Sequence, residues 1–165
     1  MKWKRWLALE LAVVLSLSWS ACKGKEKEKT EESSSSQVEQ EDPNYPVAID
    51  DIRVDKRPEQ AVSLSPALTE IIYELDSASQ LAGVSDYCDY PEGAKDKTPC
   101  GTAALPNWDA LEELQPDVVF ASASLSQENT IRLQQMDAEV VVLPPAEDLD
   151  ELEQIYITIG SILGG

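Results

Sequence analysis

The side chains available for chemistry in this 165-residue sequence are thiols, hydroxyls and carboxylates, because the sequence contains no histidine. The commonest general base and metal ligand is therefore missing. Ser63 and Ser65 have no histidine to activate them as nucleophiles. Neighbouring acidic pairs such as Glu112-Glu113 diverge around a helix instead of converging on a substrate. The residue types thus argue against an enzyme, a metal site and a bound cofactor.

The first 22 residues carry the pattern of an export signal. Basic residues within the first five positions precede the apolar segment Trp6–Trp19, which is too short for a comfortable membrane span. The small pair Ser20-Ala21 before Cys22 resembles the bacterial lipoprotein signal, in which the cysteine is acylated and becomes the new N-terminus. We therefore expect residues 1–21 to be a signal peptide and Cys22 to be the lipidation site. A plain secretory signal or an uncleaved anchor is the alternative.

Charge and composition separate a tail from a folded part. The sequence has 13 basic and 31 acidic residues, a net charge of −18, which repels nucleic acid and anionic lipid headgroups. Residues 22–46 are rich in Lys, Glu and Ser and offer little apolar surface to bury, so they are expected to be a disordered tether. The folded part is expected to span residues 47–165.

The remaining two cysteines, Cys88 and Cys100, lie twelve residues apart in the loop 85–107. In an exported chain such a pair predicts a disulfide. Free thiols are one alternative. Ligation of a metal is another, although it would have only two soft ligands and no histidine.

The elements that must position these residues alternate between strands and helices. This alternation predicts an α/β fold with a mostly parallel, Rossmann-like sheet flanked by helices. Ser65 and Pro66 are expected to cap the first helix, with the Ser65 hydroxyl accepting from free backbone N–H groups. The expected elements are a hairpin at 47–49 and 52–54, strands at 61–64, 81–84, 117–121 and 139–143, and helices at 66–77, 108–114, 127–136 and 149–163.

Ligands of such folds bind beyond the carboxyl ends of the strands, where Ser65 and Pro66 lie. Several motifs in this region occur in a characteristic order. They are VSLSPALTE at 62–70, LAGVSDY at 81–87, DYP at 89–91, Asn107 with Leu111, and LQPDVV at 114–119. Together they resemble the N-terminal lobe of the solute-binding proteins that feed cobalamin and ferric-siderophore ABC importers.

The resemblance implies roles for particular residues. Asp109 stands where the family has an acidic residue that docks onto arginines of the permease. Tyr87 and Tyr90 lie in a loop that would line the ligand cleft, together with Ser65 and Pro66. Aromatic faces suit a corrin ring or a catecholate.

The resemblance also implies a function and a location. The chain would be a substrate-binding lipoprotein of an ABC importer, lipid-anchored to the outer face of the cytoplasmic membrane. Its ligand would be a corrinoid such as cobalamin or an iron chelate (a siderophore or haem). Because the match ends where the helix between two lobes would begin, the alternative is a truncated, solitary lobe with a structural or interaction role.

Overall fold

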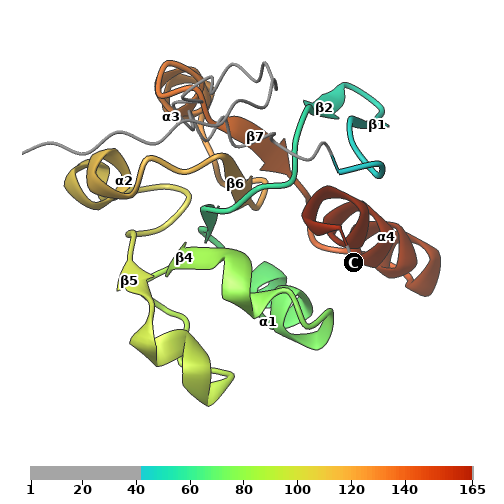
Figure 1. The fold of residues 1–165 in the computed structure, drawn as a ribbon. Helices are drawn as coiled ribbons and strands as arrows, with labels where there is room; N and C mark the ends of the chain where they lie inside the picture. The colour runs from blue at the N-terminus through green and yellow to red at the C-terminus, as the bar shows by residue number, and fades with distance from the viewer. Residues whose placement is uncertain (1–41, 165) are drawn as a thin grey trace, which may run out of the picture. The chain divides into compact units, whose positions relative to one another are not determined.

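The computed structural model describes residues 42–164 (Figure 1). The predicted signal peptide, the lipidation site Cys22 and most of the predicted tether lie outside the described residues. Among residues 42–164, no helix has the length and apolar character required to traverse a bilayer. The elements are β1 Val47–Ile49, β2 Ile52–Val54, β3 Ala61–Ser63, α1 Pro66–Glu74, η1 Ala78–Gln80, β4 Leu81–Val84, η2 Glu92–Asp96, β5 Thr98–Pro99, α2 Trp108–Leu114, β6 Val118–Ala121, α3 Gln127–Gln134, β7 Glu139–Val142 and α4 Leu149–Leu163.

Five strands form one parallel sheet in the order β5-β4-β3-β6-β7, and β1 and β2 form a separate antiparallel hairpin. The predicted α/β fold class with a parallel, Rossmann-like sheet is therefore confirmed. From β3 the chain first moves outward through β4 and β5, and then returns to the other side of β3 for β6 and β7. The direction of winding thus reverses between β3 and β6. In open α/β sheets this reversal opens a crevice at the carboxyl ends of the two strands.

The sheet has a helical layer on each side. Helices α1 and α4 cover one face, and α2 and α3 cover the other (Figure 1). Strand β6 shows how the sequence builds both layers, because successive strand residues point to opposite faces. Val118 and Phe120 pack under α1 and α4, whereas Val119 and Ala121 pack under α2 and α3, and all four are fully buried. This explains why the strand is apolar at every position.

The helices begin where capping residues precede an apolar stripe. Pro66 occupies the first turn of α1, and the side chains of Ser126 and Asp148 accept backbone N–H groups at the starts of α3 and α4. Helices α2 and α4 have the predicted limits. Helices α1 and α3 end two or three residues earlier than predicted, and such end differences are ordinary.

β5, a two-residue strand at the edge of the sheet, was not predicted from the sequence. Thr98 and Pro99 pair with Gly83 and Val84 of β4. Nothing apolar or periodic marks this segment. Proline is tolerated there because an edge strand needs its N–H on one side only.

The tether was predicted to extend to residue 46, and this limit is wrong. The Tyr45 hydroxyl donates a 2.7 Å hydrogen bond to the carbonyl of Ile162 in α4, and its ring packs against the core between the sheet and α4. Burial raises the pKa of this phenol. The folded part therefore includes Tyr45.

Asp117 connects the start of β6 to the segment that precedes β3. One carboxylate oxygen, Oδ2, accepts hydrogen bonds from the backbone N–H groups of Glu59 and Gln60, at 2.8 and 2.9 Å. We expect Asp117→Ala to lower the free energy of unfolding by about 1–3 kcal/mol, because two donors lose their acceptor. Urea unfolding followed by circular dichroism measures this loss.

The matched control is Glu113→Ala, which removes an exposed carboxylate from α2 and should change stability by less than about 0.5 kcal/mol. The stability of Asp117→Asn should lie between those of the two alanine variants, since the asparagine amide oxygen can still accept hydrogen bonds from the two backbone N–H groups. Equal stabilities of the Asp117→Ala and Glu113→Ala variants would contradict this role for Asp117.

Candidate functional site

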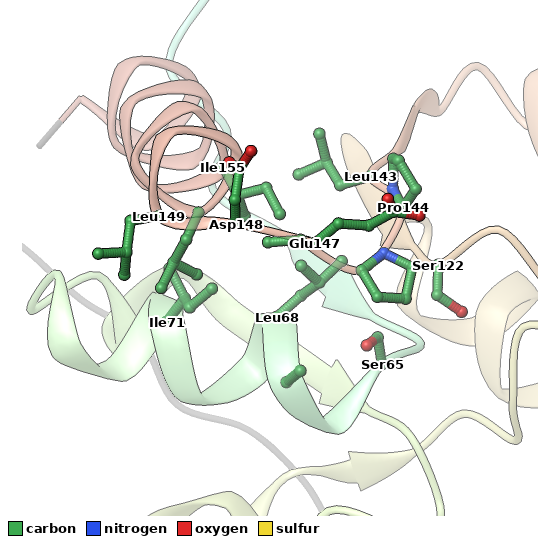
Figure 2. A pocket seen from close by; sticks show the side chains of 14 residues that line it. Ser65, Leu68, Ile71, Ser122, Leu143, Pro144, Glu147, Asp148, Leu149 and Ile155 are labelled. Atoms are coloured by element: carbon green, nitrogen blue, oxygen red, sulfur yellow. The ribbon is translucent and has the colours of Figure 1, made fainter.

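A cavity of about 560 Å³ lies at the carboxyl edge of the sheet, where the winding reverses. Ser65 follows β3, Ser122 follows β6 and Pro144 follows β7, and all three line this cavity. The starts of α1 and α4 close its sides (Figure 2). We refer to it below as the edge cavity. Its position is the one that the topology of an α/β sheet predicts for a ligand.

The wall of the edge cavity is mainly apolar. Leu68 and Ile71 project from α1, and Leu149 and Ile155 project from α4 on the opposite side (Figure 2). Leu149 is 81% exposed, so its side chain is open to solvent at the mouth of the cavity. Polar groups enter the lining from the turn at Ser65, from Ser122 and from the loop before α4.

The loop between β7 and α4 is held in place by two hydrogen bonds that resemble a capping box. Asp148 Oδ1 accepts from the backbone N–H of Glu151 at 2.9 Å, and Glu151 Oε2 accepts from the backbone N–H of Glu147 at 2.7 Å. These bonds fix the start of α4 and hence the position of Leu149. No role was predicted from the sequence for the segment between the strand at 139–143 and the helix at 149–163, so this wall was missed. The D-x-x-E signal at 148–151 was the available evidence.

Ser65 lines the edge cavity, but its predicted capping role is wrong. Its side chain makes no capping hydrogen bond. Instead its carbonyl accepts from the backbone N–H of Thr69, from Thr69 Oγ1 and from Ser63 Oγ, each at 3.0 Å. The Cys88 thiol in turn donates to Thr69 Oγ1 at 3.2 Å. Three buried side chains thus fix the turn from below, and within residues 42–164 the Ser65 hydroxyl makes no hydrogen bond at the start of α1.

The predicted disulfide between Cys88 and Cys100 is wrong, because both residues are free thiols in this structure. They lie on opposite faces of the sheet: Cys88 packs in the core under α1 and α4, and Cys100 packs in the core under α2 and α3. Burial raises the pKa of Cys88, and it raises the pKa of Cys100 to about 11. Within residues 42–164, no group of three or more Cys, Asp or Glu side chains is placed to hold a metal.

This arrangement predicts the reactivity of the two thiols. In a Cys22→Ser variant at pH 8, both should react with a disulfide reagent at least about tenfold more slowly than free cysteine, since burial keeps them protonated. Unfolding without reductant should then release both thiols to the reagent. Absorbance of the released chromophore measures each step. Failure of any thiol to appear on unfolding would show that the two are bonded.

The predicted aromatic contacts lie on the surface. Tyr87 and Tyr90 are 74% and 66% exposed in the loop after β4, and neither lines the edge cavity. Pro66 occupies the first position of α1, between the lining residues Ser65 and Ala67. Because β4 is parallel to β3, all these residues follow carboxyl ends of strands. The structure thus brings Ser65 into the cavity and leaves both tyrosines at the same edge outside it.

Asp109, the predicted docking residue, lies in the first turn of α2. Its side chain is exposed, and it forms no ion pair within the part of the chain that the structure describes. Asn107 caps the helix by accepting from the backbone N–H of Ala110. Trp108 packs below the guanidinium of Arg132, whose carbon lies 4.0 Å from the ring centroid. The carboxylate is therefore presented on a fixed helix start.

A parallel sheet with an open, apolar cavity beyond its carboxyl edge defines the class as a ligand-binding α/β lobe. A family model described as periplasmic binding protein matches residues 62–165. The chain belongs to the periplasmic binding protein family.

Curated relatives and solved structures agree with this assignment. An uncharacterized ABC transporter substrate-binding lipoprotein of Bacillus subtilis, YvrC, is 30% identical over 133 residues, which cover 77% of this chain and 42% of YvrC. A cobalamin-binding protein of Halobacterium salinarum is 28% identical over 115 residues, which cover 68% of this chain and 31% of that protein. A structure described as a possible iron-binding (periplasmic solute-binding) protein of Staphylococcus epidermidis superposes with a TM-score of 0.60 and 28% identity. The match covers 66% of this chain and 43% of that structure's chain. The chain thus spans less than half the length of these relatives.

Proposed function

We propose that the chain forms one ligand-binding wall of a substrate-binding protein that serves an ABC importer. The solute is an iron chelate or a corrinoid. The observation that carries this proposal is the edge cavity, whose apolar wall lies where the sheet topology predicts a ligand. Relatives named for ABC transport and for cobalamin binding support the solute class. The same names describe binding and transport proteins, so they give no support to a purely structural role.

In this proposal the residues predicted from the sequence have different roles in binding. Ser65 and Pro66 contact the solute at the turn between β3 and α1. Tyr87 and Tyr90 add aromatic faces from the neighbouring loop, where their exposure leaves them free to pack on a planar ligand. The chain binds its solute and does not transform it.

Asp109 would dock the loaded protein onto the permease of the importer. Its exposure at the fixed start of α2 supports this role, and a carboxylate can pair with an arginine through two parallel hydrogen bonds. An Asp109→Arg variant should leave solute binding unchanged and abolish uptake.

The location follows from the same relatives. Membership in a periplasmic binding protein family and a relative named as a lipoprotein support export and association with the membrane. The proposed anchor is a lipid on Cys22, with the folded part held outside the cytoplasmic membrane.

Equilibrium dialysis against cyanocobalamin, haemin and a set of ferric siderophores tests the function. At least one ligand should bind saturably, and Ser122→Leu, which fills part of the edge cavity, should weaken binding at least about tenfold. Ser79→Leu is the matched control, because Ser79 is exposed and does not line the cavity. No binding by any member of the panel would overturn the proposal, and binding unaffected by Ser122→Leu would remove the edge cavity as the site.

A further inference from the structure

The charged side chains that line the edge cavity are all acidic. Its lining includes the carboxylates of Glu147 and Asp148 and contains no basic side chain. In Figure 2 both acidic residues come from the loop before α4, and the apolar residues Leu68 and Ile71 of α1 lie in another part of the lining. A ligand in this cavity therefore meets negative charge and aliphatic surface together.

The Glu147 and Asp148 carboxylates differ in their hydrogen bonding. Asp148 is committed to the backbone N–H of Glu151. The Glu147 carboxylate forms no hydrogen bond or ion pair within residues 42–164, and the side chain is exposed. Glu147 also lines a second cavity of about 510 Å³ on the other side of the same loop, together with Asp50 and Glu151. The acidic surface thus continues beyond the edge cavity.

The basic side chains of the described residues are engaged elsewhere. Three form ion pairs, Lys97 donates to a carbonyl, Lys56 lines a different cavity at the amino edge of the sheet, and Arg57 lies against the end of α4. The contacts are Arg53 with Asp55 at 2.7 Å, Lys95 with Glu92 at 3.0 Å, Arg132 with Glu112 at 3.1 Å, Lys97 with the carbonyl of Ala78 at 3.0 Å, and Arg57 beside Gly164. Within residues 42–164, no basic side chain lines the edge cavity to offset the charge of an anionic ligand.

We propose that the solute is a neutral or cationic chelate with a broad apolar face, and that Glu147 selects against anionic chelates. This inference rests on the proposed function. An uncompensated carboxylate beside aliphatic surface repels a ligand carboxylate and attracts an ammonium group, and the net charge of −18 acts in the same direction. Corrinoids with intact amides and hydroxamate chelates of iron fit this description. Haem, with two propionates, and triscatecholate complexes do not.

Two ligand series, each differing in a single charge, test the proposal. The first is cyanocobalamin, its derivative with one peripheral amide hydrolysed to a carboxylate, and aquocobalamin in its cationic form. The second is a linear ferric trihydroxamate with a free terminal amine, its N-acetylated form and its N-succinylated form. Equilibrium dialysis of the full chain at low salt should rank the cation first and the anion last, with about a five- to tenfold change in affinity per unit charge. Added salt at 0.5 M should reduce this range.

Matched variants distinguish the effect of the Glu147 carboxylate from the effect of the protein's overall negative charge. Glu147→Lys should abolish or reverse the ranking, and Glu147→Gln should narrow it. Glu153→Lys makes the same change in net charge at an exposed position of α4 that does not line the cavity, and it should keep the ranking.

The outcomes distinguish the inference from the function on which it rests. Anions that bind as tightly as their neutral counterparts, or a ranking that Glu147→Lys leaves intact, would overturn the inference while solute binding stands. Absence of binding by every member of both series would overturn the proposed function and the inference with it.

Discussion

Replacing Gly101 with alanine is expected to lower the free energy of unfolding by about 3–5 kcal/mol. Gly101 has a φ of +79°, a conformation that side chains disfavour. A Cβ added here would lie 2.4 Å from the carbonyl oxygen of Leu105 and 2.6 Å from the amide nitrogen of Asn107. Both are backbone atoms, so no side-chain rotation can relieve the overlap.

The surrounding hydrogen bonds make the position rigid. The Gly101 amide donates to Asp86 Oδ1 and its carbonyl accepts from the Asp86 amide, both at 2.8 Å, which ties the loop to the end of β4. The Asn107 amide donates to the carbonyl of Cys100 at 2.9 Å, directly before α2 begins. Displacing Gly101 therefore also displaces the start of α2, where Asp109 lies.

Gly93→Ala is the matched control for this prediction. The nearest atoms to an added Cβ would be Cε1 and Oη of the Tyr73 side chain, both at 3.2 Å, and Gly93 has no positive φ. We expect this variant to lose less than about 1 kcal/mol. Urea unfolding followed by circular dichroism compares the two, and equal losses would show that the loop at Gly101 can relax.

The fold could be predicted because strands and helices of this chain carry local signals. β6 is apolar at four consecutive positions, since both faces of the sheet are covered. Asn107 and Asp148 mark helix starts with side chains that accept backbone N–H groups. β5 carried no such signal, because Thr98 and Pro99 become a strand only through pairing with β4.

The site was less predictable, because it depends on which residues the fold brings together. Topology alone placed Ser65 at the cavity, and its carboxyl-edge position could be read from the strand that precedes it. The opposite wall comes from Leu149 and its neighbours, and Leu149 lies 84 residues after Ser65 in the chain. Apolar residues at a helix start look like core residues in a sequence, and only the structure shows that Leu149 is exposed.

The disulfide prediction failed for a related reason. Sequence spacing tells how far apart Cys88 and Cys100 lie along the chain, but not on which side of the sheet each thiol points. Cys88 lies in the loop after β4, whereas Cys100 directly follows β5, and the two residues pack in different cores. Free, buried thiols in a family of exported proteins thus serve as packing groups here.

Gly83 in β4 is expected to be the second position where a single methyl group strongly destabilises the fold. A Cβ at Gly83 would lie 2.4 Å from Cys100 Sγ and 2.9 Å from Leu114 Cδ1, within the core under α2 and α3. We expect Gly83→Ala to cost about 2–3 kcal/mol, because the thiol is fully buried and has no free space to enter. Urea unfolding of the variant measures the loss.

A double-mutant cycle identifies the contact that causes this loss. Cys100→Ala alone removes the sulfur and should cost about 1 kcal/mol. In the Gly83→Ala, Cys100→Ala double variant, the new methyl group occupies the space that the sulfur leaves, so the combined loss should be at least about 1 kcal/mol smaller than the sum of the single losses. The end of the Leu114 side chain can shift at little cost, which is why the sulfur should dominate. Additive losses would instead place the strain in the backbone of β4 or at Leu114.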